Sequence, residues 1–200
     1  MKLKQFFMIG IRFMNTKNVS NQGFTLVEML VSISIIAILT GLFLANYSSI
    51  NRRTDVAMAA QVLVTDIRFA QANALGLIKY DGDAPDGGWG VYLSSDEAEN
   101  DTYTIFADLN DDGVFNDGEA AANSGGQIIA LPPNMVIDNL QLGVNAETSA
   151  QITFLPPDPI TRLSGQTGTS TVLDIRLKEK INNSTKTVRV NFLGLVEVID

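Results

Sequence analysis

The residues best suited to chemistry in this sequence form an acidic loop at residues 108–119. The loop matches the calcium-loop pattern D-x-[DN]-x-[DN]-G-x5-E at every required position. The pattern predicts side-chain oxygens from Asp108, Asn110 and Asp112, the carbonyl of Val114, a direct or water-bridged contact from Asn116, and two oxygens from Glu119. Oxygen ligands without His or Cys favour Ca²⁺ over transition metals. We expect no required cofactor, and Ca²⁺ is the possible one.

The same loop could also be a metal-free polar turn. Asp-Gly and Asn-Asp-Gly sequences are common in hairpin turns. A β-prone segment at residues 103–107 precedes the loop, and no convincing amphipathic helix flanks it. An isolated calcium loop and a plain turn therefore both stay open, and a paired-helix EF-hand is not expected.

Catalysis has little support in the residue types present. The chain contains no histidine and no cysteine, so it lacks the commonest general base and any thiolate nucleophile. No P-loop, dinucleotide-binding fingerprint or nucleophile elbow occurs. We expect the protein not to be an enzyme.

Charge is distributed unevenly along the chain, whose formal net charge is −8. Four of the 14 bases and none of the 22 acids lie in residues 1–23. Residues 81–119 hold twelve acids and no base. The part of the chain after the basic segment should therefore repel polyanions over much of its surface.

A long apolar run at residues 24–45 has Glu28 as its only charge. As a helix its 22 residues would span about 33 Å, enough to cross a bilayer. The basic segment before it predicts a cytoplasmic N-terminus. The polar break comes before the apolar run, whereas an ordinary secretory signal has its cleavage site after it. A plain signal anchor is the alternative.

The helical pattern continues beyond the apolar run and becomes amphipathic. No proline occurs between residues 24 and 84, so one helix from residue 24 to near Leu75 is expected. Apolar residues recur there at spacings of three and four, which predicts a helix with one buried stripe. The stripe consists of Val56, Ala60, Leu63, Ile67, Ala70 and Ala74.

From residue 80 the sequence is typical of short strands separated by turns. The predicted strands are residues 89–93, 103–107, 127–131, 151–154, 171–177, 187–192 and 195–199. They suggest one or two antiparallel sheets, with the helix stripe covering one sheet face. The expected fold class is α+β.

The segment from Gly23 to Leu30, GFTLVEML, closely resembles the signal of type IV prepilins and pseudopilins. The resemblance implies that a membrane peptidase, prepilin peptidase, cuts between Gly23 and Phe24 and N-methylates Phe24. It implies a pilin fold with a leader at 1–23, a transmembrane half-helix at 24–45, an amphipathic half-helix at 46–76 and a β-rich domain at 77–200. The true start could be Met1, Met8 or Met14.

The family pattern implies that Glu28 neutralises the N-terminal amine of a neighbouring subunit during assembly. A carboxylate inside an apolar spanning helix costs several kcal/mol unless it is paired. It lies four residues from the new N-terminus, on the same helix face. An interfacial glutamate reaching water is the alternative.

Three later segments resemble the GspH/FimT-like minor pseudopilins. They are residues 66–74, residues 152–158 with Gly165 beyond, and the ending at residues 187–198 around "N-x-x-G". The middle segment differs from the pattern of these pseudopilins because it has an inserted proline and lacks a glycine after Asp158. The alternative is that these segments are ordinary β-hairpin sequences, whose residue types recur in unrelated proteins.

The resemblance implies a minor pilin or pseudopilin of a type IV pilus or type II secretion filament. Its expected partners are prepilin peptidase, other pilin subunits, an inner-membrane assembly platform and membrane lipid. The expected location is the bacterial inner membrane, single-pass with an external C-terminal domain, and then the filament. A DNA-binding minor pilin is the weaker alternative, because residues 160–200 carry six bases without a dense basic cluster.

Overall fold

The computed structural model describes residues 23–116, 118–119, 127–156 and 160–199, except for the side chains of residues 45–52. The predicted leader, apart from Gly23, lies outside the described residues. The chain divides into two compact units, Met1–Phe43 and Leu44–Asp200, and each is described by itself.

A single helix, α1 (Leu26–Leu75), accounts for the helical part of the described chain. Its end has the hydrogen bonds of a Schellman motif: Ile78 donates its N–H to the carbonyl of Asn73 (3.0 Å), and Leu77 donates to Ala74 (3.1 Å). Leu77 has a φ of 50°, a left-handed conformation that ends the helix. The helix therefore ends where the sequence predicts.

In the first unit, α1 exposes apolar side chains all round. Leu26–Leu44 is long and apolar enough to cross a membrane, and none of it is buried. Phe24 and Leu26 are each 81% exposed. An exposed apolar helix of this length is consistent with membrane anchoring.

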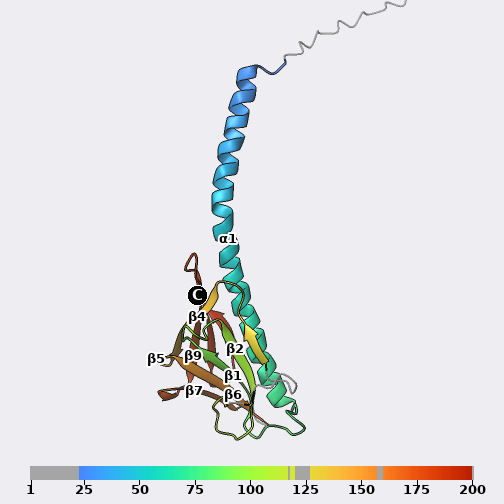
Figure 1. Cartoon of the computed structure of the whole chain (residues 1–200), viewed down its shortest axis with the longest axis vertical. Helices are drawn as coiled ribbons and strands as arrows, with labels where there is room; N and C mark the ends of the chain where they lie inside the picture. Colours follow the sequence, from blue (N-terminus) through green and yellow to red (C-terminus); the bar gives the residue numbers. More distant parts are fainter. Residues whose placement is uncertain (1–22, 117, 120–126, 157–159, 200) are drawn as a thin grey trace, which may run out of the picture. The chain divides into compact units, whose positions relative to one another are not determined.

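The second unit contains two antiparallel sheets (Figure 1). The six-stranded sheet has the order β3-β2-β1-β6-β7-β8, and the five-stranded sheet has the order β11-β10-β9-β4-β5. The strands of the first sheet are β1 (Gly88–Ser94), β2 (Thr102–Asp108), β3 (Gln127–Ala130), β6 (Ser149–Leu155), β7 (Ile160–Gly165) and β8 (Gly168–Thr169). Those of the second are β4 (Met135–Leu142), β5 (Asn145–Glu147), β9 (Val172–Glu179), β10 (Thr185–Asn191) and β11 (Val196–Ile199).

The predicted helix stripe lies in the core of the second unit. All six of its residues are at most 1% exposed, and they share one hydrophobic cluster with strands of both sheets. In Figure 1 the second half of α1 runs beside β2, and the hydroxyl of Tyr103 on β2 donates to the carboxylate of Asp66 on α1. The α+β pilin fold expected from the sequence is confirmed.

All seven predicted strands are present, but β4, β5, β7 and β8 were not predicted. In β4, Asp138 and Asn139 interrupt the apolar alternation, and the pairing with β9 shifts register between Ile137 and Asn139. Such a bulge hides the period-two pattern by which strands are recognised. Strand β7 follows a proline-rich segment that is typical of a turn.

Candidate functional site

The start of α1 is built as a capping box. Thr25 donates its backbone N–H to Oε2 of Glu28 (2.9 Å), and its hydroxyl donates to the same oxygen (2.8 Å). In return, Glu28 donates its backbone N–H to Oγ1 of Thr25 (3.2 Å). These reciprocal bonds satisfy donors that the first turn of a helix otherwise leaves unpaired.

The candidate scissile bond lies just outside this cap. Gly23, Phe24 and Thr25 precede the helix in non-helical backbone, and Phe24 is exposed. The predicted processing residues Gly23 and Phe24 and the predicted assembly residue Glu28 therefore lie close together in the sequence, on either side of Thr25. Sequence reasoning missed Thr25, although Thr-x-x-Glu before an apolar run is a recognised capping signature.

The N-terminal segment also matches a known family. Residues 19–44 match the family model described as the prokaryotic N-terminal methylation motif. The motif indicates a type IV pilin-like protein. It supports the pilin and pseudopilin superfamily, implies processing by prepilin peptidase and assembly with other pilin subunits, and points to a structural subunit, not an enzyme. No curated protein and no solved structure matches the chain.

The pilin-like chain carries its predicted calcium loop at the end of β2. Asp108 is the last residue of that strand and is fully buried. Its Oδ2 accepts the N–H of Gly113 (2.8 Å), and its Oδ1 has no hydrogen-bond partner among the described residues. Gly113 has a φ of 71°, the conformation that a sharp turn requires.

Glu119 closes the other end of the loop and is 4% exposed. Its Oε1 accepts the N–H of Leu109 (3.2 Å), and its Oε2 accepts the N–H of Asn116 (2.7 Å). Burial raises the pKa of Asp108 and of Glu119, and nearby carboxylate charges raise both further. Hydrogen bonding, chiefly from the N–H of Val114, lowers the pKa of Asp112.

Asn110, Asp112, Val114 and Asn116 bond to one another in this structure. The Asn110 amide donates to Oδ2 of Asp112 (2.8 Å), and the Asn116 amide donates to the same oxygen (3.1 Å) and to the carbonyl of Val114 (3.0 Å). Within the described residues, no three His, Cys, Asp or Glu side chains are grouped so that they alone could hold a metal. The predicted residues thus lie together on the loop, but the described acidic side chains by themselves do not form a metal site there.

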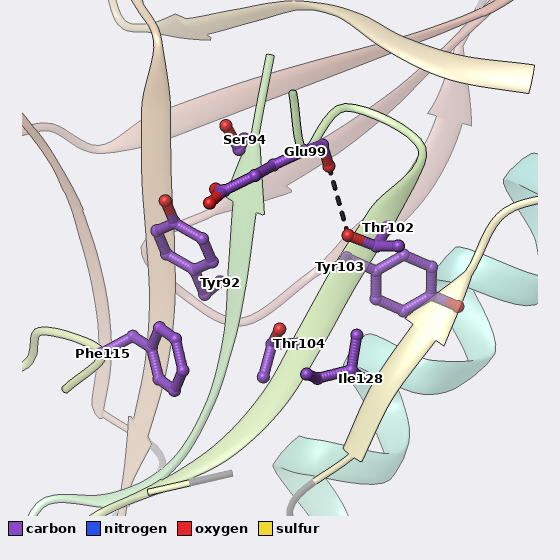
Figure 2. A pocket seen from close by; sticks show the side chains of 8 residues that line it. All are labelled: Tyr92, Ser94, Glu99, Thr102, Tyr103, Thr104, Phe115 and Ile128. Carbon is purple, nitrogen blue, oxygen red and sulfur yellow. Dashed lines mark hydrogen bonds between the residues drawn. The ribbon is translucent and has the colours of Figure 1, made fainter. Parts of the chain in front are cut away.

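A small hollow lies beside this loop, over β1 and β2 (Figure 2). Figure 2 shows Phe115, which the loop contributes, next to Tyr92 on β1, with ring centroids 5.2 Å apart. The rest of the lining consists of Ser94, Glu99, Thr102, Tyr103, Thr104 and Ile128. The hollow mixes aromatic and hydroxyl groups and presents no set of groups arranged for catalysis.

The basic residues considered for DNA binding are largely paired with acids. Arg162 contacts Asp111 (2.8 Å), and Arg189 contacts Asp174 (2.7 Å). Arg176 and Lys178 both contact Asp138 (2.7 and 3.5 Å). A basic side chain that is paired with an acid contributes less positive electrostatic potential for binding a phosphate backbone.

Proposed function

We propose that this pilin-like protein is a minor pilin or pseudopilin of a type IV pilus or type II secretion filament. Prepilin peptidase cuts between Gly23 and Phe24 and methylates Phe24, and the subunit then assembles through α1. The observation that carries the proposal is the motif at residues 19–44, which contains the wholly exposed apolar span Leu26–Leu44. Before assembly that span is held by inner-membrane lipid, with the β-rich domain outside.

The subtype proposal rests on how the GspH/FimT-like segments meet. Asn191 Oδ1 accepts the N–H groups of Leu193 and Leu195 (both 3.0 Å), which shapes the turn between β10 and β11. Arg68 of α1 donates to the carbonyl of Val196 (3.1 Å), next to that turn. The helix segment and the final hairpin thus pack together, as a shared structural element would.

DNA uptake is the weaker alternative. The ion pairs of four of its candidate basic residues and the acidic character of residues 81–119 both oppose it. We therefore keep the filament role as the proposed function.

The cleavage step is tested by co-expressing the full chain with prepilin peptidase and identifying the N-terminus by mass spectrometry. The expected N-terminus is N-methylated Phe24. Gly23→Val should abolish cleavage, because a β-branched side chain obstructs the close approach that glycine permits. Gly41→Val is the matched control: a Cβ at either glycine meets no atom within 4 Å. An N-terminus at Phe24 in the Gly23→Val variant, or a cut at another bond in the parent chain, would overturn the assignment.

A further inference from the structure

One buried oxygen in the loop at residues 108–119 lacks a hydrogen-bond partner within the described residues. Asp108 is 0% exposed, and its Oδ1 makes no hydrogen bond to the part of the chain that the structure describes, although its Oδ2 accepts the backbone N–H of Gly113. Burying a charged oxygen without a partner is costly, because the hydration it loses is not replaced. A proton or a cation at this oxygen would compensate for that loss.

The neighbouring groups favour a cation. Five further candidate ligands lie on the same short loop: the side chains of Asn110, Asp112, Asn116 and Glu119, and the carbonyl of Val114. Asp112 already receives two amide donors, from Asn110 and Asn116. Rotating those amides by half a turn exchanges nitrogen for oxygen, so the same side chains can face a cation with their oxygens.

We propose that the loop from Asp108 to Glu119 binds one Ca²⁺ ion. The ligands are Asp108 Oδ1, the side-chain oxygens of Asn110, Asp112 and Glu119, the carbonyl of Val114, and Asn116 directly or through water. Three of these six residues supply amide or backbone oxygens, so the site does not depend on carboxylates alone. The proposal is independent of the filament role.

A metal-free polar turn explains less of what is observed. It accounts for the bonds that Asn110, Asp112 and Asn116 make to nearby backbone and side chains. It does not account for a fully buried strand-end carboxylate with an unpartnered oxygen. A divalent cation would satisfy that oxygen and offset the mutual repulsion of Asp108, Asp112 and Glu119.

The ligand chemistry selects Ca²⁺ over Mg²⁺. A loop whose ligands come from side chains, a carbonyl and water adapts to the six to eight oxygens that Ca²⁺ accepts. Mg²⁺ demands near-ideal octahedral geometry and gives up its waters reluctantly. The expected dissociation constant is about 10⁻⁴ to 10⁻³ M, as in extracellular calcium modules.

The bound ion would fix the loop against the six-stranded sheet. Ser164 on β7 already donates to the carbonyl of Gly113 (3.2 Å). Phe115 packs on Tyr92 and on Phe106, with ring centroids 5.2 and 5.4 Å away. Calcium is therefore expected to stabilise the wall of the hollow in Figure 2 that Phe115 forms.

The test is isothermal titration of CaCl₂ into the full chain, purified in detergent micelles and freed of metal. We expect one Ca²⁺ per chain, and binding of MgCl₂ at least about tenfold weaker. Glu119→Gln and Asp112→Asn should each weaken Ca²⁺ binding at least about tenfold, because even outer-sphere partners of a metal are worth that much. Asp112 is exposed, so its variant tests the site even if Glu119→Gln does not fold.

Asp111→Asn is the matched control. It removes one charge from the same loop at a position that the pattern does not use, and asparagine tolerates the φ of 56° found there. Its affinity should stay within about twofold of the parent, since exposed charges contribute little to a specific site. No saturable heat at about 10 mM Ca²⁺, equal binding of Mg²⁺, or an equal loss in Asp111→Asn would each overturn the proposal.

Discussion

At the level of single residues, the carboxylate of Glu28 has one observed role and one proposed role, and the two are separable. In the structure it caps α1 by accepting from Thr25. In the proposed filament it neutralises a neighbour's amine. A cap needs only a hydrogen-bond acceptor, whereas neutralisation needs a negative charge. Substitutions that separate acceptor from charge can therefore assign the roles.

We predict that Glu28→Gln and Glu28→Ala are both cleaved normally and both fail to enter filaments. The glutamine retains an oxygen for Thr25 but lacks the charge, so the shared failure would identify charge as the property needed. Mass spectrometry of the N-terminus and immunoblotting of sheared filaments provide the two readouts. Thr25→Val is the control: it loses the capping hydroxyl, at a cost of about 1 kcal/mol, but retains the charge, and should assemble. Normal assembly of Glu28→Gln would contradict the charge role.

Residue types predicted the processing motif and the acidic loop, but not what surrounds them. The spacing D-x-N-x-D-G-x5-E is visible in the sequence. That Asp108 ends a strand fully buried, with one oxygen unpartnered, depends on how β1 and β2 pair. Burial of this kind is a tertiary property, so a local sequence pattern does not predict it.

At the level of elements, the second half of α1 is an amphipathic helix that is stabilised by the packing of one of its faces in the core. Leu63 is 0% exposed, and its neighbour Val62 is 52% exposed. Helices in proteins are stabilised mainly by packing of such a face, so the two positions should respond very differently to truncation.

We predict that Leu63→Ala lowers the free energy of unfolding by about 2–5 kcal/mol, because it leaves a cavity in the core. Val62→Ala should change it by no more than about 0.5 kcal/mol. Chemical denaturation followed by the emission of Trp89, the one tryptophan in the chain and fully buried, measures both. Equal losses at the two positions would show that the helix stripe is not packed as described.

The helix was predictable from the sequence almost to the residue, because its apolar period is uninterrupted and proline is absent from residues 24–84. Strands with clean alternation were predictable too. Strand β4 was not, since its register shift places Asp138 and Asn139 where an apolar residue would continue the pattern. An irregular strand that pairs on both sides is specified by its neighbours, here β9 and β5.

At the level of the whole molecule, the hydrophobic core belongs to one unit. Within the described residues, every buried apolar side chain lies between Val56 and Val196. The apolar span Leu26–Leu44 contributes nothing to that core. Folding of the β-rich domain should therefore not require the membrane segment.

We predict that a chain of residues 53–200 is a folded, water-soluble monomer. It retains the whole helix stripe and both sheets, so its circular dichroism should show helix and strand and its Trp89 emission should match that of the full chain. A chain of residues 77–200 is the control: it exposes the sheet surface that α1 covers and should aggregate. Size-exclusion chromatography distinguishes the two, and aggregation of residues 53–200 would refute the independence of the domain.

The capping box at Thr25 and Glu28 has a consequence for the timing of maturation. Among the described residues its hydrogen bonds join Thr25 and Glu28, and neither lies on the leader side of the Gly23–Phe24 bond. Leader removal would therefore leave the first turn of α1 as it was. The proposed cleavage would then change the charge at this end of the helix without a refolding step: the basic side chains of the leader would leave, and one amine would appear.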